Sequence, residues 1–148
     1  MTAVSFVAMY VLMYAMVDSF ANVYPNYNQF YMAGLMAAPM LLIELAFMHG
    51  MYHGKKLNAA ITVFGVAAII GFFMLVRTQA AVGDEQFLRS MIPHHASALL
   101  MCERAQLTDP EVQALCRNII KGQQTEIDWM KGKLEEIGSG EKQAAGHP

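Results

Sequence analysis

The feature that most constrains this chain is the uneven distribution of its charges. The first 76 residues carry four charged side chains, Asp18, Glu44, Lys55 and Lys56, and the rest of the chain carries all the others, from a total of 10 basic and 12 acidic residues. Apolar residues make up 55% of the sequence, which excludes a disordered chain. We therefore expect an all-α protein whose first half lies in a membrane and whose second half lies in water.

Three apolar stretches in the first half each have about the 20 residues that a helix needs to cross roughly 30 Å of hydrocarbon. They cover residues 3–23, 30–52 and 57–76, so we predict a three-span membrane domain over residues 1–77. The first stretch lacks the basic start of a cleaved signal peptide, and we expect it to stay on the protein.

The two predicted connections between the spans differ in charge. The first, residues 22–29, has none, whereas the second holds Lys55 and Lys56. Basic loops stay in the cytoplasm. We therefore expect a cytoplasmic N-terminus, with residues 22–29 and everything after Arg77 on the extracytoplasmic side.

Methionines recur every four residues in the second predicted span, which places them on one helical face. Such a stripe is explained by soft packing or, alternatively, by a thioether path for Cu(I). The M-x3-M step resembles the one in the second span of three-span copper transporters, although their G-x3-G is absent here. Asp18 and Glu44 are candidates because carboxylates inside a membrane are costly. The candidate membrane metal path comprises Met36, Met40, Glu44, Met48, His49 and His53.

The second half reads as a helical hairpin over residues 84–137, followed by a flexible tail at 138–148. Apolar residues keep helical spacing up to about Gln106. Thr108 and Glu111 have the spacing of a capping box, and Gly138 is a natural stop. Because two helices cannot enclose a core alone, we expect a dimeric four-helix bundle or, alternatively, docking on the membrane helices.

The predicted hairpin brings a group of metal-ligating side chains together. Folding about residues 108 and 109 places His94 and His95 opposite Gln123, with Glu126 within a turn. Thioether and imidazole ligands suit Cu(I), and imidazole with carboxylate also suits Cu(II) or Zn(II). The alternative is that His94 is solvated near Pro93 and His95 bonds Gln123. The predicted metal ligands are Met91, His94, His95, Met101, Glu126 and Met130, with Gln123 as their supporting neighbour.

The same stretch resembles the domain of unknown function family 305. The pattern M-I-P-H-H, a Met seven residues after the first His, a D-P turn and Q-x2-E-I-x2-M are all present over residues 84–134. The resemblance implies a ferritin-like bundle in an exported or membrane-anchored bacterial protein that binds copper or confers copper tolerance. The chain departs from the family at Ala96 and Ser97, where Gln-Gly is usual, and in having three predicted spans where one anchor is commoner.

The cysteines lie at equal distances from the predicted turn. Cys102 is seven residues before Asp109 and Cys116 is seven after it. An extracytoplasmic location favours a disulfide. Buried thiols and a pair of Cu(I) ligands are the alternatives.

Together these features predict a copper-binding protein of the bacterial inner membrane, which buffers, tolerates or delivers copper, prefers Cu(I), and forms homo-oligomers. A partner protein that receives the metal is compatible with this function. The alternatives are a metal transporter and a structural protein whose hairpin only dimerises. No enzymatic motif is apparent, and the net charge of −2 argues against nucleic-acid binding.

Overall fold

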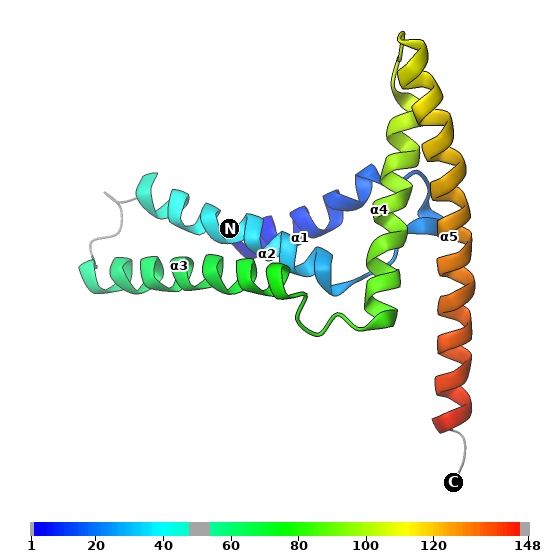
Figure 1. Ribbon diagram of the computed structural model, residues 1–148. Coiled ribbons are helices and arrows are strands. Elements are labelled where there is room, and N and C mark those ends of the chain that lie inside the picture. Colours follow the sequence, from blue (N-terminus) through cyan, green and yellow to red (C-terminus); the bar gives the residue numbers. More distant parts are fainter. Residues whose placement is uncertain (1, 48–53, 146–148) are drawn as a thin grey trace. The chain divides into compact units, whose positions relative to one another are not determined.

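The computed structural model shows a helical protein and describes residues 2–47 and 54–145, with side chains for 2–47 and 54–140 (Figure 1). The described residues contain no strand, which confirms the all-α prediction. The helices, in chain order, are α1 (Thr2–Leu12), η1 (Met13–Met16), η2 (Phe20–Asn22), α2 (Tyr27–Phe47), α3 (Lys55–Thr78), α4 (Asp84–Arg104) and α5 (Pro110–Ala145).

The chain divides into two compact units. The first combines the N-terminal residues up to Met13 with residues 27–81, and thus contains α1, α2 and α3. The second, here called the hairpin unit, combines residues 14–26 with the chain from Val82 onward. The change in composition predicts a domain boundary near residue 77. It does not predict that residues 14–26 belong to the second unit.

Small residues allow α2 and α3 to lie close together in the first unit. A Cβ added at Gly34 would overlap the ring of Phe72, and one at Gly65 would meet Leu42. The Tyr31 hydroxyl donates a hydrogen bond to the carbonyl of Ala80, 2.7 Å away, which fixes the chain as it leaves α3. This close antiparallel pair is the framework of the first unit.

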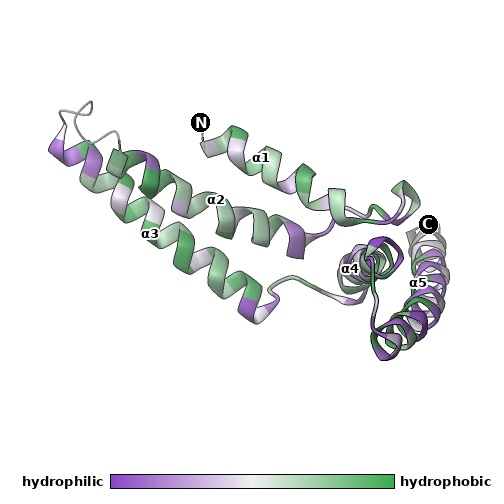
Figure 2. Ribbon diagram, turned by 90° about the horizontal axis from the view of Figure 1, so that it is seen from above, coloured by the Kyte–Doolittle hydropathy of each residue, from purple (hydrophilic) through white to green (hydrophobic). Residues whose placement is uncertain are grey.

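Two helices, α2 and α3, have the length and apolar composition needed to cross a membrane. Figure 2 shows both as mainly hydrophobic, whereas α4 and α5 mix hydrophilic and hydrophobic residues. The first apolar helix covers only Thr2–Met16. At 1.5 Å per residue it is about 22 Å long, which is short of the hydrocarbon thickness.

The first predicted span, residues 3–23, therefore differs from the structure, because its helix ends near Met16. The residues that follow include polar side chains that bond locally. Asn22 Nδ2 donates to Asp18 Oδ1 at 2.6 Å, and the Tyr14 hydroxyl donates to the carbonyl of Tyr24 at 2.9 Å. Such side-chain bonds compete with the helical ladder, which explains why the helix stops.

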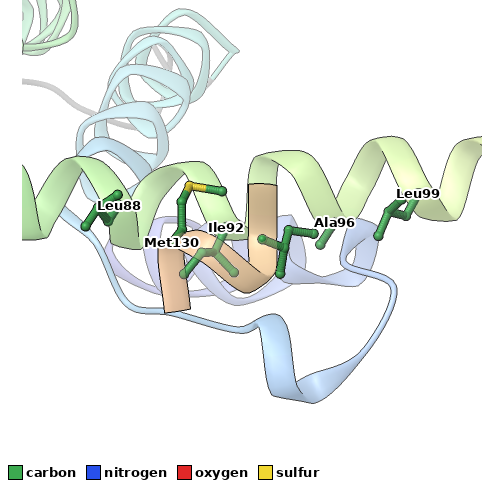
Figure 3. Packing of buried hydrophobic residues seen from close by; sticks show 6 residues of the cluster. Leu88, Ile92, Ala96, Leu99 and Met130 are labelled. Carbon is green, nitrogen blue, oxygen red and sulfur yellow. The ribbon is translucent and has the colours of Figure 1, made fainter. Parts of the chain in front are cut away.

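The hairpin unit has a small apolar core between α4 and α5 (Figure 3). Ile92 and Ala96 of α4 and Ile127 of α5 are fully buried. Val17 and Tyr24, from the segment before α2, pack against this core. We expected a second hairpin or the membrane helices to cover this core. Val17 and Tyr24 of the same chain provide part of the cover.

The ends of α4 and α5 differ in detail from the prediction. The Asp109 carboxylate, not Thr108, caps α5, because its Oδ1 accepts hydrogen bonds from the backbone N–H groups of Glu111 and Val112 at 2.8 and 3.1 Å. Pro110 then occupies the first helical position. The helix also continues through Gly138 to Ala145, so the predicted stop at Gly138 is wrong.

Candidate functional site

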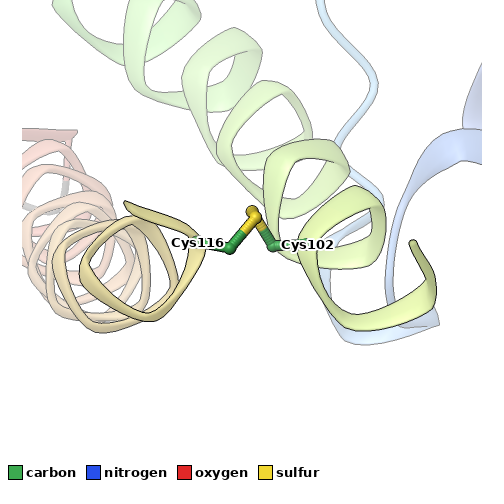
Figure 4. The surroundings of a disulfide bond; sticks show 2 residues. All are labelled: Cys102 and Cys116. Carbon is green, nitrogen blue, oxygen red and sulfur yellow. A yellow bond between two sulfur atoms is a disulfide. The ribbon is translucent and has the colours of Figure 1, made fainter. Parts of the chain in front are cut away.

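The register of the hairpin is set near its turn. A disulfide joins Cys102 of α4 to Cys116 of α5, with Cα atoms 5.3 Å apart (Figure 4). In antiparallel helices, each step back along α4 from Cys102 is matched by a step forward along α5 from Cys116. This register places His95 level with Gln123 and one turn from Glu126.

His95 and Glu126 form a polar contact across the seam between α4 and α5. His95 Nδ1 lies 3.0 Å from Glu126 Oε2. Nδ1 is nevertheless buried without a hydrogen bond, so the two atoms are close but not aligned as donor and acceptor. The His95 side chain is 14% exposed and the Glu126 side chain 60%, so the contact lies where the core meets solvent.

Burial lowers the pKa of His95 below its usual 6.5, because desolvation disfavours the charged imidazolium. The Glu126 carboxylate raises this pKa and the neighbouring His94 lowers it, both by less than burial does. His95 is therefore neutral at pH 7. Neutral imidazole is the form that binds metal ions.

The remaining predicted ligands are dispersed around this contact. His94 is exposed, and its ring centroid is 5.9 Å from that of His95. Met130 is 5% exposed and belongs to the apolar core, Met91 packs against that core, and Met101 is 61% exposed. Within the side chains that the structure describes, no three His, Cys, Asp or Glu residues form a group that could hold a metal ion.

Gln123 lies beside Glu126 on α5, three residues apart on the same helical face. Its Oε1 is buried and makes no hydrogen bond. The alternative to a metal site was a hydrogen bond between His95 and Gln123. The structure does not show this hydrogen bond. Two buried polar atoms, His95 Nδ1 and Gln123 Oε1, are left unsatisfied on facing turns of the hairpin.

The described members of the candidate membrane metal path lie in the first unit, whereas Asp18 belongs to the hairpin unit. Met36 is 49% exposed, and Met40 and Glu44 are half-buried, so this stripe is not on the most buried face of α2. Met48, His49 and His53 lie outside the described residues. The structure therefore describes only Met36, Met40 and Glu44 of the candidate membrane metal path, and these three side chains are partly exposed.

The segment that covers the hairpin core was missed by sequence reasoning. The sequence predicts Val17 in a span and Tyr24 in a loop, because their local sequence is apolar and Tyr-rich, yet both pack against the hairpin core. The polar pair Asp18 and Asn22 was the available indication that the helix stops there.

Comparison with known proteins identifies a matching family model and a relative of this chain. The model of the domain of unknown function DUF305 matches residues 78–147. No solved structure matches the chain. An uncharacterized protein of Acanthamoeba polyphaga mimivirus, L153, is 34% identical over 139 residues, which cover 92% of this chain and 90% of the viral protein. The similarity thus extends over the apolar half as well as the hairpin. The chain therefore belongs to the same family as that viral protein, and its C-terminal part is a DUF305 domain.

Proposed function

We propose that this protein is a membrane-anchored, extracytoplasmic copper-binding protein that buffers or delivers copper through its helical hairpin. The observation that carries the proposal is His95 Nδ1, which is buried without a hydrogen bond and lies 3.0 Å from Glu126 Oε2. A buried polar atom without a partner is costly, and a bound ion is one way to satisfy it.

The donor chemistry fits copper. His94 and His95 supply imidazole, Glu126 supplies carboxylate, and Met91, Met101 and Met130 place thioethers on the same two helices. Imidazole binds both oxidation states of copper, whereas thioether favours Cu(I). When bound, the ion would be held chiefly by His94 and His95, with Glu126 neutralising part of its charge.

Among the predicted hairpin ligands, all of them in the part of the chain that the structure describes, His95 and Glu126 are brought into direct contact. We therefore propose that the ligand set is completed between two hairpins. The flank of α4 that carries His94 and Met101 is exposed in the single chain. At 100° per residue these two side chains share one side of α4. A symmetric dimer would bring two such flanks together around the ions.

Membrane attachment is supported by the exposure of α3. Only 6% of its most apolar window is buried within the structure, and its exposed side chains include Val63, Phe64, Ile70 and Phe73. So large an apolar surface is unfavourable in water and favourable in lipid. The lipid bilayer is thus the proposed environment of α2 and α3.

The proposed topology is supported by the composition of the hairpin unit. Residues 14–26 belong to the same compact unit as α4 and α5, and must therefore lie on the same side of a membrane. Lys55 and Lys56 precede the apolar part of α3 at its other end, and basic residues favour the cytoplasm. The hairpin is accordingly extracytoplasmic in this proposal, and a bacterial inner membrane as host remains a prediction from the resemblance.

The test is competitive Cu(I) titration of the full-length protein in detergent, with metal content measured in parallel. We expect stoichiometric, tight binding that is lost in the His94→Ala/His95→Ala double variant and kept in Gln124→Ala, which changes an exposed side chain on the adjacent face of α5. Binding unchanged in the double variant would move the site to the membrane residues, and Met36→Leu would then abolish it. No binding in any form would leave the hairpin as an assembly module.

A further inference from the structure

The polar atoms buried in the seam of the hairpin differ in chemistry from the thioethers around it. His95 Nδ1 and Gln123 Oε1 are buried and unsatisfied, and Glu126 Oε2 is 3.0 Å from the former. These are one nitrogen and two oxygen donors. The thioether of Met130 is instead packed in the apolar core, and that of Met101 is 61% exposed.

The separation of His95 Nδ1 and Glu126 Oε2 is informative because the pair does not form a hydrogen bond. Metal–nitrogen and metal–oxygen bonds to zinc are about 2.0–2.2 Å, so two atoms that share an ion in tetrahedral or octahedral geometry are about 2.9–3.5 Å apart. The observed 3.0 Å lies in this range.

Gln123 completes the arrangement. It is three residues before Glu126 on α5, so the two side chains are neighbours on one face. The Cys102–Cys116 register places Gln123 level with His95. An amide oxygen is a neutral metal ligand, and the burial of Gln123 Oε1 without a hydrogen bond needs a partner.

We propose that the seam between α4 and α5 holds a separate site for a divalent cation of the Zn(II) or Cu(II) class, bound by His95 Nδ1, Gln123 Oε1 and Glu126 Oε2. This inference rests on the proposed metal-binding function and divides it into two sites. The inner site uses nitrogen and oxygen donors, which suit divalent ions. The outer one uses His94, the other ring nitrogen of His95 and the exposed Met101, which suit Cu(I). The free position of the inner site is open to water, because Glu126 is 60% exposed.

The experiment measures the affinity of the full-length protein in detergent for Zn(II) and, separately and without oxygen, for Cu(I). Gln123→Leu removes the amide and keeps the size of the side chain, and Glu126→Gln removes the charge. We expect each change to weaken Zn(II) binding by about tenfold or more. Gln123→Leu should leave Cu(I) binding unchanged, because Gln123 is not one of the proposed copper ligands. Met101→Leu should do the reverse.

Two further variants guard against trivial explanations. Gln124→Leu introduces the same side chain at the adjacent, exposed position and should bind Zn(II) as the parent does. Gln123→Glu adds a second carboxylate and should tighten Zn(II) binding, a gain that loss of folding cannot produce. Far-ultraviolet circular dichroism of each variant checks that the helices are intact.

The outcomes separate this inference from the proposed function. Cu(I) binding together with Zn(II) affinity that Gln123→Leu and Glu126→Gln leave unchanged would overturn the inner site and keep the copper function. Binding of Cu(I) without binding of Zn(II) would also overturn the inner site and keep the copper function. Water would then occupy the seam. Failure to bind either ion would overturn both proposals.

Discussion

Gly34 of α2 lies so close to the ring of Phe72 in α3 that a Cβ at this position would overlap the ring. The contact is central to the first unit, because Phe72 also packs against Phe30, whose ring in turn meets that of Phe6 in α1. The position thus links all three apolar helices through one aromatic cluster.

We predict that Gly34→Ala destabilises the first unit by about 1–3 kcal/mol, as expected when an extra methyl is forced into a packed contact. Gly71→Ala is the matched control, since a Cβ there meets nothing within 4 Å. The measurement is the thermal unfolding midpoint of the purified protein in detergent. Equal midpoints for the two variants would contradict the close approach of α2 and α3.

The cover that residues 14–26 give to the hairpin core leads to a second prediction. Tyr24 packs against the buried cluster of α4 and α5, whereas Phe20 in the same segment is 97% exposed. We expect Tyr24→Ala to lower the unfolding free energy of the hairpin unit by about 1–3 kcal/mol, through loss of apolar burial. Phe20→Ala should leave it unchanged.

Hydrogen exchange of the amides in α4 and α5 measures this effect, because it reports on the stability of the hairpin apart from the apolar helices. Faster exchange in Tyr24→Ala than in Phe20→Ala is the expected result. Equal exchange in both variants would show that the segment does not stabilise the hairpin.

A third prediction concerns Cys102 and Cys116, which are 14 residues apart in sequence and joined across the hairpin turn. A crosslink that closes a loop of about 15 residues stabilises a fold by about 3 kcal/mol, chiefly by restricting the unfolded chain. The Cys102→Ser/Cys116→Ser variant should therefore unfold at lower denaturant concentration than the oxidised parent. It should match the parent treated with a reductant, and a difference between those two would point to another role for the thiols.

The local elements of this protein follow from its sequence, whereas the contacts between distant segments do not. Helical spacing and the D-P turn predict α4, α5 and the pairing of residues such as Cys102 with Cys116, because the register of a short hairpin depends only on where the turn lies. Asp109 rather than Thr108 became the cap because Pro110 starts the helix directly after it.

The role of residues 14–26 could not be predicted in this way. Their apolar composition is compatible with a span, and whether a helix continues past Met16 depends on contacts with α4, which begins at Asp84. The continuation of α5 through Gly138 is a similar case, since glycine only weakens a helix, by roughly 1 kcal/mol relative to alanine. In the site, spacing placed His95, Gln123 and Glu126 near one another, but it could not show which polar atoms are buried without partners.

The lowered pKa of His95 gives a last prediction, for the metal-free protein. Burial makes the neutral imidazole the favoured form in the folded state, so the folded pKa lies below the unfolded value of 6.5. The stability from this group is fully present above pH 6.5. It is lost as the pH falls from 6.5 towards the folded pKa, because the unfolded chain then binds the proton more readily. Denaturant unfolding of the hairpin unit at a series of pH values, with a chelator present, should show this decline in the parent and a smaller one in His95→Gln. Identical pH profiles for the two proteins would mean that His95 has the same pKa in the folded and the unfolded state. Its burial would then not disfavour the charged imidazolium.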